Sequence, residues 1–125
     1  MNPNTSDATP VWANHPSTPL VHALEPWQSS TDLADLRLTV EMRNRVGDIK
    51  FQAFIQYADD PMDPTTWSTP TAIGALLSAN GTSSSAWTSV TSGKKRFYRT
   101  GVRAVNDSST SLNLAHAILR KETRS

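Results

Sequence analysis

The residues best placed for chemistry are three carboxylates in one loop, Asp59, Asp60 and Asp63. Oxygen ligands of this kind suit a hard cation such as Ca²⁺. The spacing, however, lacks the alternating aspartates and the distal glutamate of a calcium loop. Aspartates also cap turns by accepting hydrogen bonds from nearby backbone N–H groups, and Pro61 and Pro64 mark this stretch as turns. We therefore favour turns over a cation site here.

Other constellations for catalysis or metal binding are weaker. The three histidines, His15, His22 and His116, form no ligand set by their spacing. No serine lies in a Gly-x-Ser-x-Gly elbow, and no glycine-rich phosphate loop occurs. The absence of cysteine excludes disulfides, thiolate chemistry and cysteine metal sites. We therefore expect no enzyme, no catalytic or metal-binding residue and no cofactor, and His116 acting with an aspartate is the remaining catalytic alternative.

Composition sets the class of protein. A chain of 125 residues has room for one domain, and its 37% apolar residues support a modest core. No apolar run approaches the roughly 18 residues that a membrane span needs. The first residues lack the basic region and apolar stretch of a signal peptide, so export by that route is not expected.

The elements that would hold any site are predicted to be strands. From residue 36 onward apolar and polar residues alternate as in half-buried strands. The expected strands are residues 36–43, 49–57, 71–77, 84–90, 96–105 and 111–119. Gly47 marks a turn after the first of them, and Asn80 with Gly81 predicts a type I′ turn. Short connections without helices favour antiparallel pairing in two packed sheets. The fold class is therefore all-β, an antiparallel β-sandwich of jelly-roll or Ig-like type with an extended N-terminal arm.

Two positions depart from this pattern. Phe54 places a large ring on the strand face that should be wet, where the arm, a loop or another subunit would have to cover it. Residues 30–36 are the best candidate for a short helical turn, because Ser30 or Thr31 would serve as its N-cap.

Residues 1–31 are predicted to be a proline-rich, strand-free arm, and residues 32–125 the β-sandwich domain. Large apolar side chains lie between the prolines of the arm, and burying one of them is worth roughly 1.5–3 kcal/mol. These residues are Trp12, Leu20, Val21, Leu24 and Trp27. We expect them to anchor the arm on a neighbouring chain, with a disordered tail as the alternative. Removal of residues 1–30 is expected to leave a folded domain that no longer assembles.

Charge is unevenly distributed although the net charge is only +1. Residues 1–35 carry four acidic side chains and no Lys or Arg, whereas residues 94–125 carry eight basic side chains and two acidic ones. We expect a basic face around Arg96, Arg99 and Arg103 to meet an acidic partner surface. Nucleic acid is the alternative, because aromatic residues adjoin these arginines. The small overall charge favours a protein partner over nucleic acid.

Three stretches resemble small β-sandwich virion proteins of tailed bacteriophages: residues 49–60 (IKFQAFIQYADD), residues 66–67 (TW) and residues 95–104 (KRFYRTGVRA). In those proteins a strand that ends in Gln-x-Ser/Ala-Asp-Asp is followed by Thr-Trp and, later, by an Arg-Tyr/Phe-x-Arg strand. The resemblance covers residues 36–119. It implies a capsid decoration, cement or minor virion protein without catalysis, assembled in the host cytoplasm and present in the virion. Its partners would be further copies of itself, the major capsid protein, or both, and no membrane.

A carbohydrate- or surface-binding β-sandwich is the rival hypothesis. Trp67 and Trp87 lie near expected loop ends, where together they would form an aromatic platform.

Overall fold

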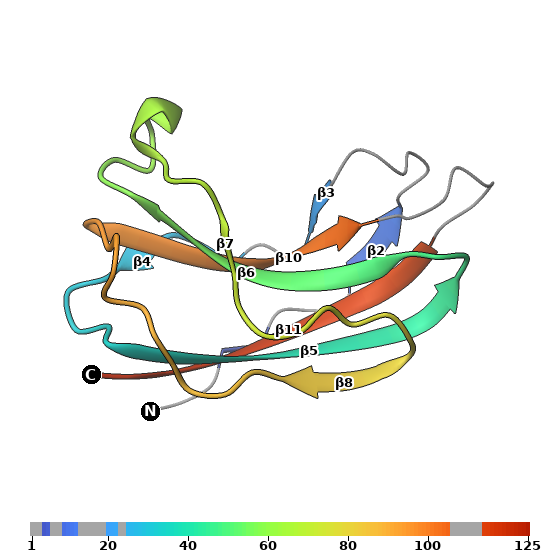
Figure 1. The fold of residues 1–125 in the computed structure, drawn as a ribbon. Helices are drawn as coiled ribbons and strands as arrows, with labels where there is room; N and C mark the ends of the chain where they lie inside the picture. The colour runs from blue at the N-terminus through green and yellow to red at the C-terminus, as the bar shows by residue number, and fades with distance from the viewer. Residues whose placement is uncertain (1–3, 6–8, 13–19, 23–24, 106–113) are drawn as a thin grey trace.

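The computed structural model describes residues 4–5, 9–12, 20–22, 25–105 and 114–125, with the backbone alone at residues 4–22, 105 and 114. Two antiparallel sheets pack face to face as a sandwich (Figure 1). The prediction of an all-β sandwich is therefore confirmed. No helix in the described ranges is long and apolar enough to span a membrane.

Two long strand pairs form the centre of the sandwich. In the first sheet β5 (Asp35–Val46) pairs with β11 (Leu114–Arg124), and in the second sheet β6 (Lys50–Ala58) pairs with β10 (Phe97–Val105). Alternate residues of each strand face the other sheet, as the sequence pattern predicted for β5, β6 and β10. In β11 the pattern groups Leu112, Leu114, His116 and Ile118 on one face, but the buried side chains are those of the opposite face, Ala115, Ala117, Leu119 and Lys121. The inward-facing side chains form one apolar core, with Leu36, Phe51, Val102 and Leu119 almost completely buried.

Short strands complete each sheet. In the first sheet, β1 (Asn4–Thr5) and β2 (Thr9–Trp12) pair with β11, while β8 (Gly81–Ser84) and β9 (Thr88–Ser89) pair with β5. In the second sheet, β3 (Leu20–His22) and β4 (Gln28–Ser29) pair with β10, while β7 (Thr71–Ala72) pairs with β6.

The pairing is nested along the chain, and nesting defines the topology. Strand β2 pairs with β11, β3 with β10, β5 with β8 and β6 with β7. Apart from β6 and β7, successive strands of this set lie in opposite sheets. An antiparallel ribbon rolled up in this way is a jelly roll. Of the two sandwich types predicted from the sequence, the structure has the jelly roll.

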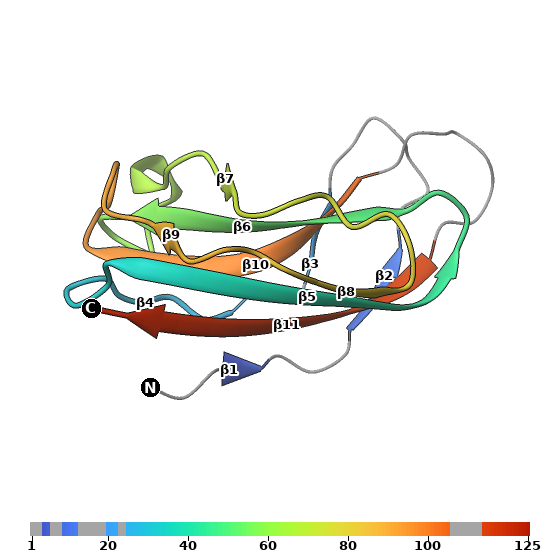
Figure 2. The same cartoon turned by 60° about the horizontal axis from the view of Figure 1, so that its bottom comes forward.

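The prediction of a strand-free arm is wrong for the described residues. Strands β1 to β4 all lie within residues 1–31, and Figure 2 shows β1 and β2 beside β11. Without them, β10 and β11 would each present an edge of unpaired N–H and C=O groups. Threonine, valine and tryptophan in β2 favour strands, and Pro10 is tolerated because β2 is an outer strand. The arm therefore contributes to both sheets of the sandwich.

Two predicted local features differ from the structure. Asn80 does not have positive φ, so the type I′ turn at Asn80 and Gly81 is wrong. The chain passes there from β7 in the second sheet to β8 in the first, and the Asn80 side chain accepts a hydrogen bond from the Arg45 N–H at 3.0 Å. The expected helical turn at residues 30–36 is a simple turn from Ser30 to Leu33, with the Leu33 N–H donating to the Ser30 carbonyl at 3.1 Å, because β5 already begins at Asp35.

Other predicted features hold. Gly47 has a φ of 82° in the turn between β5 and β6, where a side chain would be strained. The 3₁₀ helix η1 (Pro64–Thr66) is the only helix in the described residues. Phe54 lies on the outer face of the second sheet, outside the main core cluster, and is nevertheless fully buried. Its ring is therefore covered within the single chain, without another subunit.

Candidate interaction surface

The outer face of the second sheet carries an arginine that lies against two neighbouring indoles. Successive residues of β10 alternate between faces, so Arg99 points outward while its neighbours Tyr98 and Thr100 are buried. The guanidinium carbon of Arg99 lies 4.6 Å from the ring centre of Trp27 and 4.7 Å from that of Trp67. The two ring centres are 5.4 Å apart, with the ring planes inclined by 50°. The cation therefore stacks on both indoles at once.

Backbone hydrogen bonds fix both tryptophans. Trp27 lies between the Glu25 N–H, which donates to the Thr100 carbonyl at 2.8 Å, and the β4–β10 pairing. The Trp67 N–H donates to the Pro64 carbonyl at 3.1 Å, which closes η1. The first of these hydrogen bonds reaches β10, and the second lies in the loop that follows β6. Both indole rings contact Arg99 of β10.

A neutral amide orients the guanidinium. The Nε of Arg99 donates to the Gln56 Oε1 at 2.9 Å, and the Gln56 Nε2 donates to the Ser68 carbonyl at 2.9 Å. Burial lowers the pKa of Arg99 from its ordinary value, yet an arginine remains protonated in proteins. We call Trp27, Gln56, Trp67 and Arg99 the Arg99 stack.

This face offers hydrogen-bond donors that lack acceptors. Two buried nitrogens on it, the Nε1 of Trp67 and the Nε of Arg103, have no hydrogen-bond partner. Among the described residues, no carboxylate forms an ion pair with Arg96, Arg99 or Arg103. The ion pairs in these ranges lie on the first sheet instead, where Arg37 pairs with Glu122, Arg43 with Glu41 and Arg124 with Asp35.

A second arginine–indole cluster lies on the first sheet. The guanidinium carbons of Arg124 and Arg37 lie 4.1 Å and 5.0 Å from the ring centre of Trp87. Both arginines are also ion-paired, Arg124 with Asp35 at 3.0 Å and Arg37 with Glu122 at 2.7 Å. We call these five residues the Trp87 stack.

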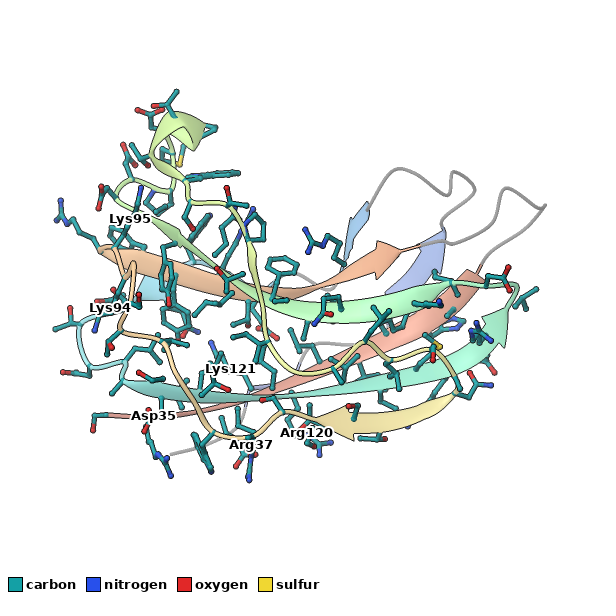
Figure 3. All side chains as sticks on the ribbon, in the orientation of Figure 1. Asp35, Arg37, Lys94, Lys95, Arg120 and Lys121 are labelled. Atoms are coloured by element: carbon teal, nitrogen blue, oxygen red, sulfur yellow. The ribbon has the colours of Figure 1, made fainter. Side chains whose placement is uncertain are left out.

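A buried polar cluster joins the two sheets near the arm. Lys121 is 2% exposed, and its Nζ donates to the Gln28 Oε1 at 2.9 Å. The Tyr98 hydroxyl donates to the same oxygen at 3.0 Å, and Glu25 is buried nearby with an unpaired Oε1. Burial lowers the pKa of Lys121, and the Glu25 charge partly offsets this; burial and Glu25 together raise the pKa of Tyr98. Figure 3 shows Lys121 between the sheets.

A cavity of about 500 Å³ opens beside this cluster. Gln28, Leu33, Tyr98 and Thr123 are among the residues that line it. Its lining shares Gln28 and Tyr98 with the buried polar cluster and also includes the acidic side chain of Asp32.

The predicted partner-binding residues have different places. Trp27 and Arg99 are brought together, and Arg103 lies on the same outer face of β10. Arg96 is exposed just before β10, with its guanidinium carbon 5.9 Å from the ring centre of Phe97. The backbone of Trp12 belongs to β2 and that of Leu20 and Val21 to β3, whereas Leu24 lies outside the described residues.

The aromatic platform of Trp67 and Trp87 is not formed. Trp67 bridges to Ala58 of β6 and stacks on Arg99, whereas Trp87 stacks on arginines of β5 and β11. The two indoles therefore belong to opposite outer faces of the sandwich.

The loop of three aspartates forms turns, as predicted. The Asp60 Oδ1 accepts from the Met62 N–H at 2.9 Å, and the Asp63 Oδ1 accepts from the Thr65 N–H at 3.1 Å as the N-cap of η1. No three metal-ligating side chains gather within the described part of the chain. The Nδ1 of His116 lies 3.4 Å from the Asn44 Nδ2, and His15 lies outside the described residues.

Sequence reasoning missed the companions of these residues. Gln56 and Trp67 were not linked to Arg99, and Lys121 was treated as part of a general basic region. The signal for Gln56 was its place two residues from Phe54 on the same outer face. Lys121 had no such signal, because the alternation pointed to the face of His116 and Ile118 and the predicted strand ended at residue 119. Comparison of the chain with protein-family models, with curated proteins and with solved structures finds no match.

Proposed function

We propose that the chain is a structural assembly protein of a virion, a decoration or cement protein of a tailed-bacteriophage capsid or another minor virion component. It would join neighbouring subunits, either copies of itself or the major capsid protein, without catalysis and without a cofactor. The resemblance of residues 36–119 to such proteins supports this proposal. So does the jelly-roll fold, which viral capsid domains use, although fold alone never assigns a function.

One observation carries the proposal: the N-terminal strands are added at the outer edges of both sheets. Strand β2 lies on the free edge of β11 and β3 on the free edge of β10. A terminal segment that pairs with an edge in its own chain makes the same backbone hydrogen bonds on the same edge of a neighbour. The arm can thus tie subunits together by strand exchange. Docking in its own chain, which this structure describes, is the alternative form of the same contact.

An engineered disulfide distinguishes the two forms. Thr5 of β1 lies opposite Arg120 of β11 in the antiparallel register, and the chain has no cysteine of its own. Directly opposed residues in such a pair have Cα atoms about 4.5–5.5 Å apart, which a disulfide can bridge. We expect Thr5→Cys/Arg120→Cys to form covalent oligomers in the assembled protein on a non-reducing gel. The two single-cysteine variants are the controls for random cross-linking.

Particle mass and virion labelling complete the test. Light scattering of the full chain should give a mass well above the 13.7 kDa of one chain. An antiserum against the chain should label the heads or tails of intact tailed virions in electron micrographs. A monomer at every concentration, with intrachain disulfides only and with unlabelled virions, would overturn the proposal.

Carbohydrate binding is the second candidate, and the Trp27–Trp67 pair is the observation that favours it. Two half-buried indoles 5.4 Å apart offer apolar surface for a sugar ring, although their 50° inclination departs from a flat platform. A glycan array should then bind the chain, and Trp27→Ala and Trp67→Ala should both abolish the signal. Trp87→Ala is the matched control, because Trp87 lies on the other sheet. An array without signal excludes this candidate.

A further inference from the structure

Two arginine–indole clusters on opposite faces differ in one component. In the Trp87 stack both guanidinium groups have a carboxylate, Arg37 from Glu122 and Arg124 from Asp35. In this cluster the chain itself provides each arginine with both an aromatic ring and a carboxylate partner. Stacking positions the guanidinium plane, and the carboxylate takes its N–H groups.

The Arg99 stack has the aromatic faces without a carboxylate. Its two indoles lie 4.6 Å and 4.7 Å from the guanidinium carbon, so Arg99 contacts two rings, whereas each arginine of the Trp87 stack contacts the ring of Trp87. The one side-chain acceptor on it among the described residues is the Gln56 amide, which takes the Nε–H. A guanidinium has five N–H donors, and its fork matches a carboxylate in a bidentate pair.

We propose that the Arg99 stack binds a carboxylate side chain of a partner protein, so that the outer face of the second sheet is a docking surface for an acidic segment. This inference goes beyond the proposed function because it does not use the N-terminal strands. A guanidinium fixed by stacking loses little conformational freedom when it binds, and arginine and tryptophan are the residues that dominate interfaces.

The surrounding charges agree with an acidic partner. Arg103 lies on the same outer face of β10 as Arg99, Arg96 is exposed just before this strand, and neither forms an ion pair with a described carboxylate. The unpaired nitrogens of Trp67 and Arg103 are buried, so they do not themselves face a partner. The stacked guanidinium of Arg99 is the donor group that this proposal uses. An acidic segment supplies both the negative charge and the acceptors that this face lacks.

A protein carboxylate fits this face better than a nucleic acid does. Stacking of bases needs free aromatic faces, whereas Arg99 already occupies one face of each indole. The two lysines that precede Arg96 do not extend this group of arginines into a longer row of cations for a phosphate backbone. The Nζ of Lys94 donates to the Leu33 carbonyl at 2.8 Å, and that of Lys95 to the Thr66 carbonyl at 2.7 Å. Both lysines are thus engaged within the chain.

The experiment uses the ¹⁵N-labelled full chain and a hexaglutamate peptide with blocked termini. Each of the four tryptophans gives one indole N–H signal in a two-dimensional spectrum, assigned by substitution to phenylalanine. We expect the Trp27 and Trp67 signals to shift in a saturable way that weakens with added salt, while the Trp87 signal stays in place. A hexamer of deoxythymidine is titrated in parallel.

Two variants test the role of Arg99. Arg99→Gln should weaken peptide binding at least tenfold, whereas Arg124→Gln, the matched change in the Trp87 stack, should leave it unchanged. Gln56→Glu supplies a carboxylate within the chain at the Arg99 Nε and should also weaken binding at least tenfold. The same spectra report whether each variant is folded, so Gln56→Glu decides the question if Arg99→Gln does not fold.

Several outcomes overturn the proposal. They are an absence of shifts at Trp27 and Trp67, equal shifts at Trp87, unchanged binding by folded Arg99→Gln or Gln56→Glu, and tighter binding of the oligonucleotide than of the peptide. None of them depends on where β1 or β2 docks, so failure here is distinguishable from failure of the proposed function.

Discussion

The guanidinium carbon of Arg99 lies 4.6 Å from the ring centre of Trp27 in the same chain. Trp27 was expected to anchor the arm on a neighbour, and Arg99 was expected to face an acidic partner. The structure makes them partners of each other. The base of the arm is therefore fixed on its own domain through Trp27, whatever the strands that precede it do.

The Trp27–Arg99 contact should be measurable as a coupling free energy. We expect Trp27→Ala and Arg99→Gln each to lower the free energy of unfolding by roughly 1–2 kcal/mol, because each removes a stacked, half-buried group. The double variant should be less destabilised than the sum, with a coupling of about 0.5–1 kcal/mol. Urea denaturation followed by circular dichroism provides the measurement.

The matching control pairs Arg99→Gln with Trp87→Ala. Since Trp87 lies on the opposite sheet, the effects of these two substitutions should add within about 0.5 kcal/mol. If Trp27 and Arg99 prove equally additive, their stacking contributes nothing to stability.

Two truncations should differ in stability. Removal of residues 1–24 deletes β1 to β3 and opens the edges of β10 and β11, so we expect a less stable protein that tends to associate through those edges. Removal of residues 1–30 also deletes Trp27 and the hydrogen bonds of Glu25 and Ser30 to β10. We expect the longer truncation to be less stable by at least 2 kcal/mol in urea denaturation. The expectation of a folded domain after removal of residues 1–30 holds if the longer truncation still unfolds cooperatively in urea.

The long strands were predictable because their signal is local. Alternation along β5, β6 and β10 fixes which residues are buried, and the structure agrees with it at Leu36, Phe51 and Val102. In β11 the alternation groups His116 and Ile118 on one face with Leu112 and Leu114, whereas the structure buries the opposite face, with Ala115, Ala117 and Leu119. In contrast, Thr9–Trp12 and Leu20–His22 are too short and too interrupted by proline to show a period. They become strands because long strands elsewhere leave edges to be covered, which no local pattern reports.

The candidate surface was predictable only in part, because its residues come together through contacts between segments that are far apart in the sequence. Arg99 and Trp27 were selected for their residue types, but their contact depends on the pairing of β4 with β10 across 70 residues of sequence. Gln56 and Trp67 join them through β6 and the loop after η1. The turn at Asn80 shows the converse case, since a strong local signal is overridden when the chain must cross between sheets.

A glycine pair tests the crossing between the sheets. Gly74 has a φ of +78°, and a Cβ there would lie 3.1 Å from the Ser85 Cβ, while Gly93 has a φ of +73° and open space. Gly93→Ala should cost about 1 kcal/mol from backbone strain alone. Gly74→Ala should cost roughly 2 kcal/mol in thermal or urea denaturation, because Ser85 must also move and its Oγ accepts a hydrogen bond from the Leu38 N–H at 3.0 Å. Equal costs would mean that the contact with Ser85 relaxes freely.

Buried Lys121 should give the protein a pH-dependent stability. Burial holds its pKa below the ordinary value of 10.5, so the unfolded chain binds this proton more tightly than the folded one. Between the folded-state pKa and 10.5, the free energy of unfolding contributed by this group therefore rises with pH. Below that window the cost of burying the cation is fully present.

The substitution that tests this is Lys121→Met, which keeps most of the side-chain volume without the charge. We expect the difference in free energy of unfolding, wild type minus Lys121→Met, to be larger at pH 10 than at pH 7 in urea denaturation. Measurements stop there because Tyr57 and Tyr98, whose pKa values are raised by burial, favour unfolding above pH 10. Lys50→Met, a change on the outer face of β6, should leave the slope of the wild type intact. A flat difference for Lys121→Met would show that Gln28 and Glu25 fully replace the water that the ammonium group loses on folding.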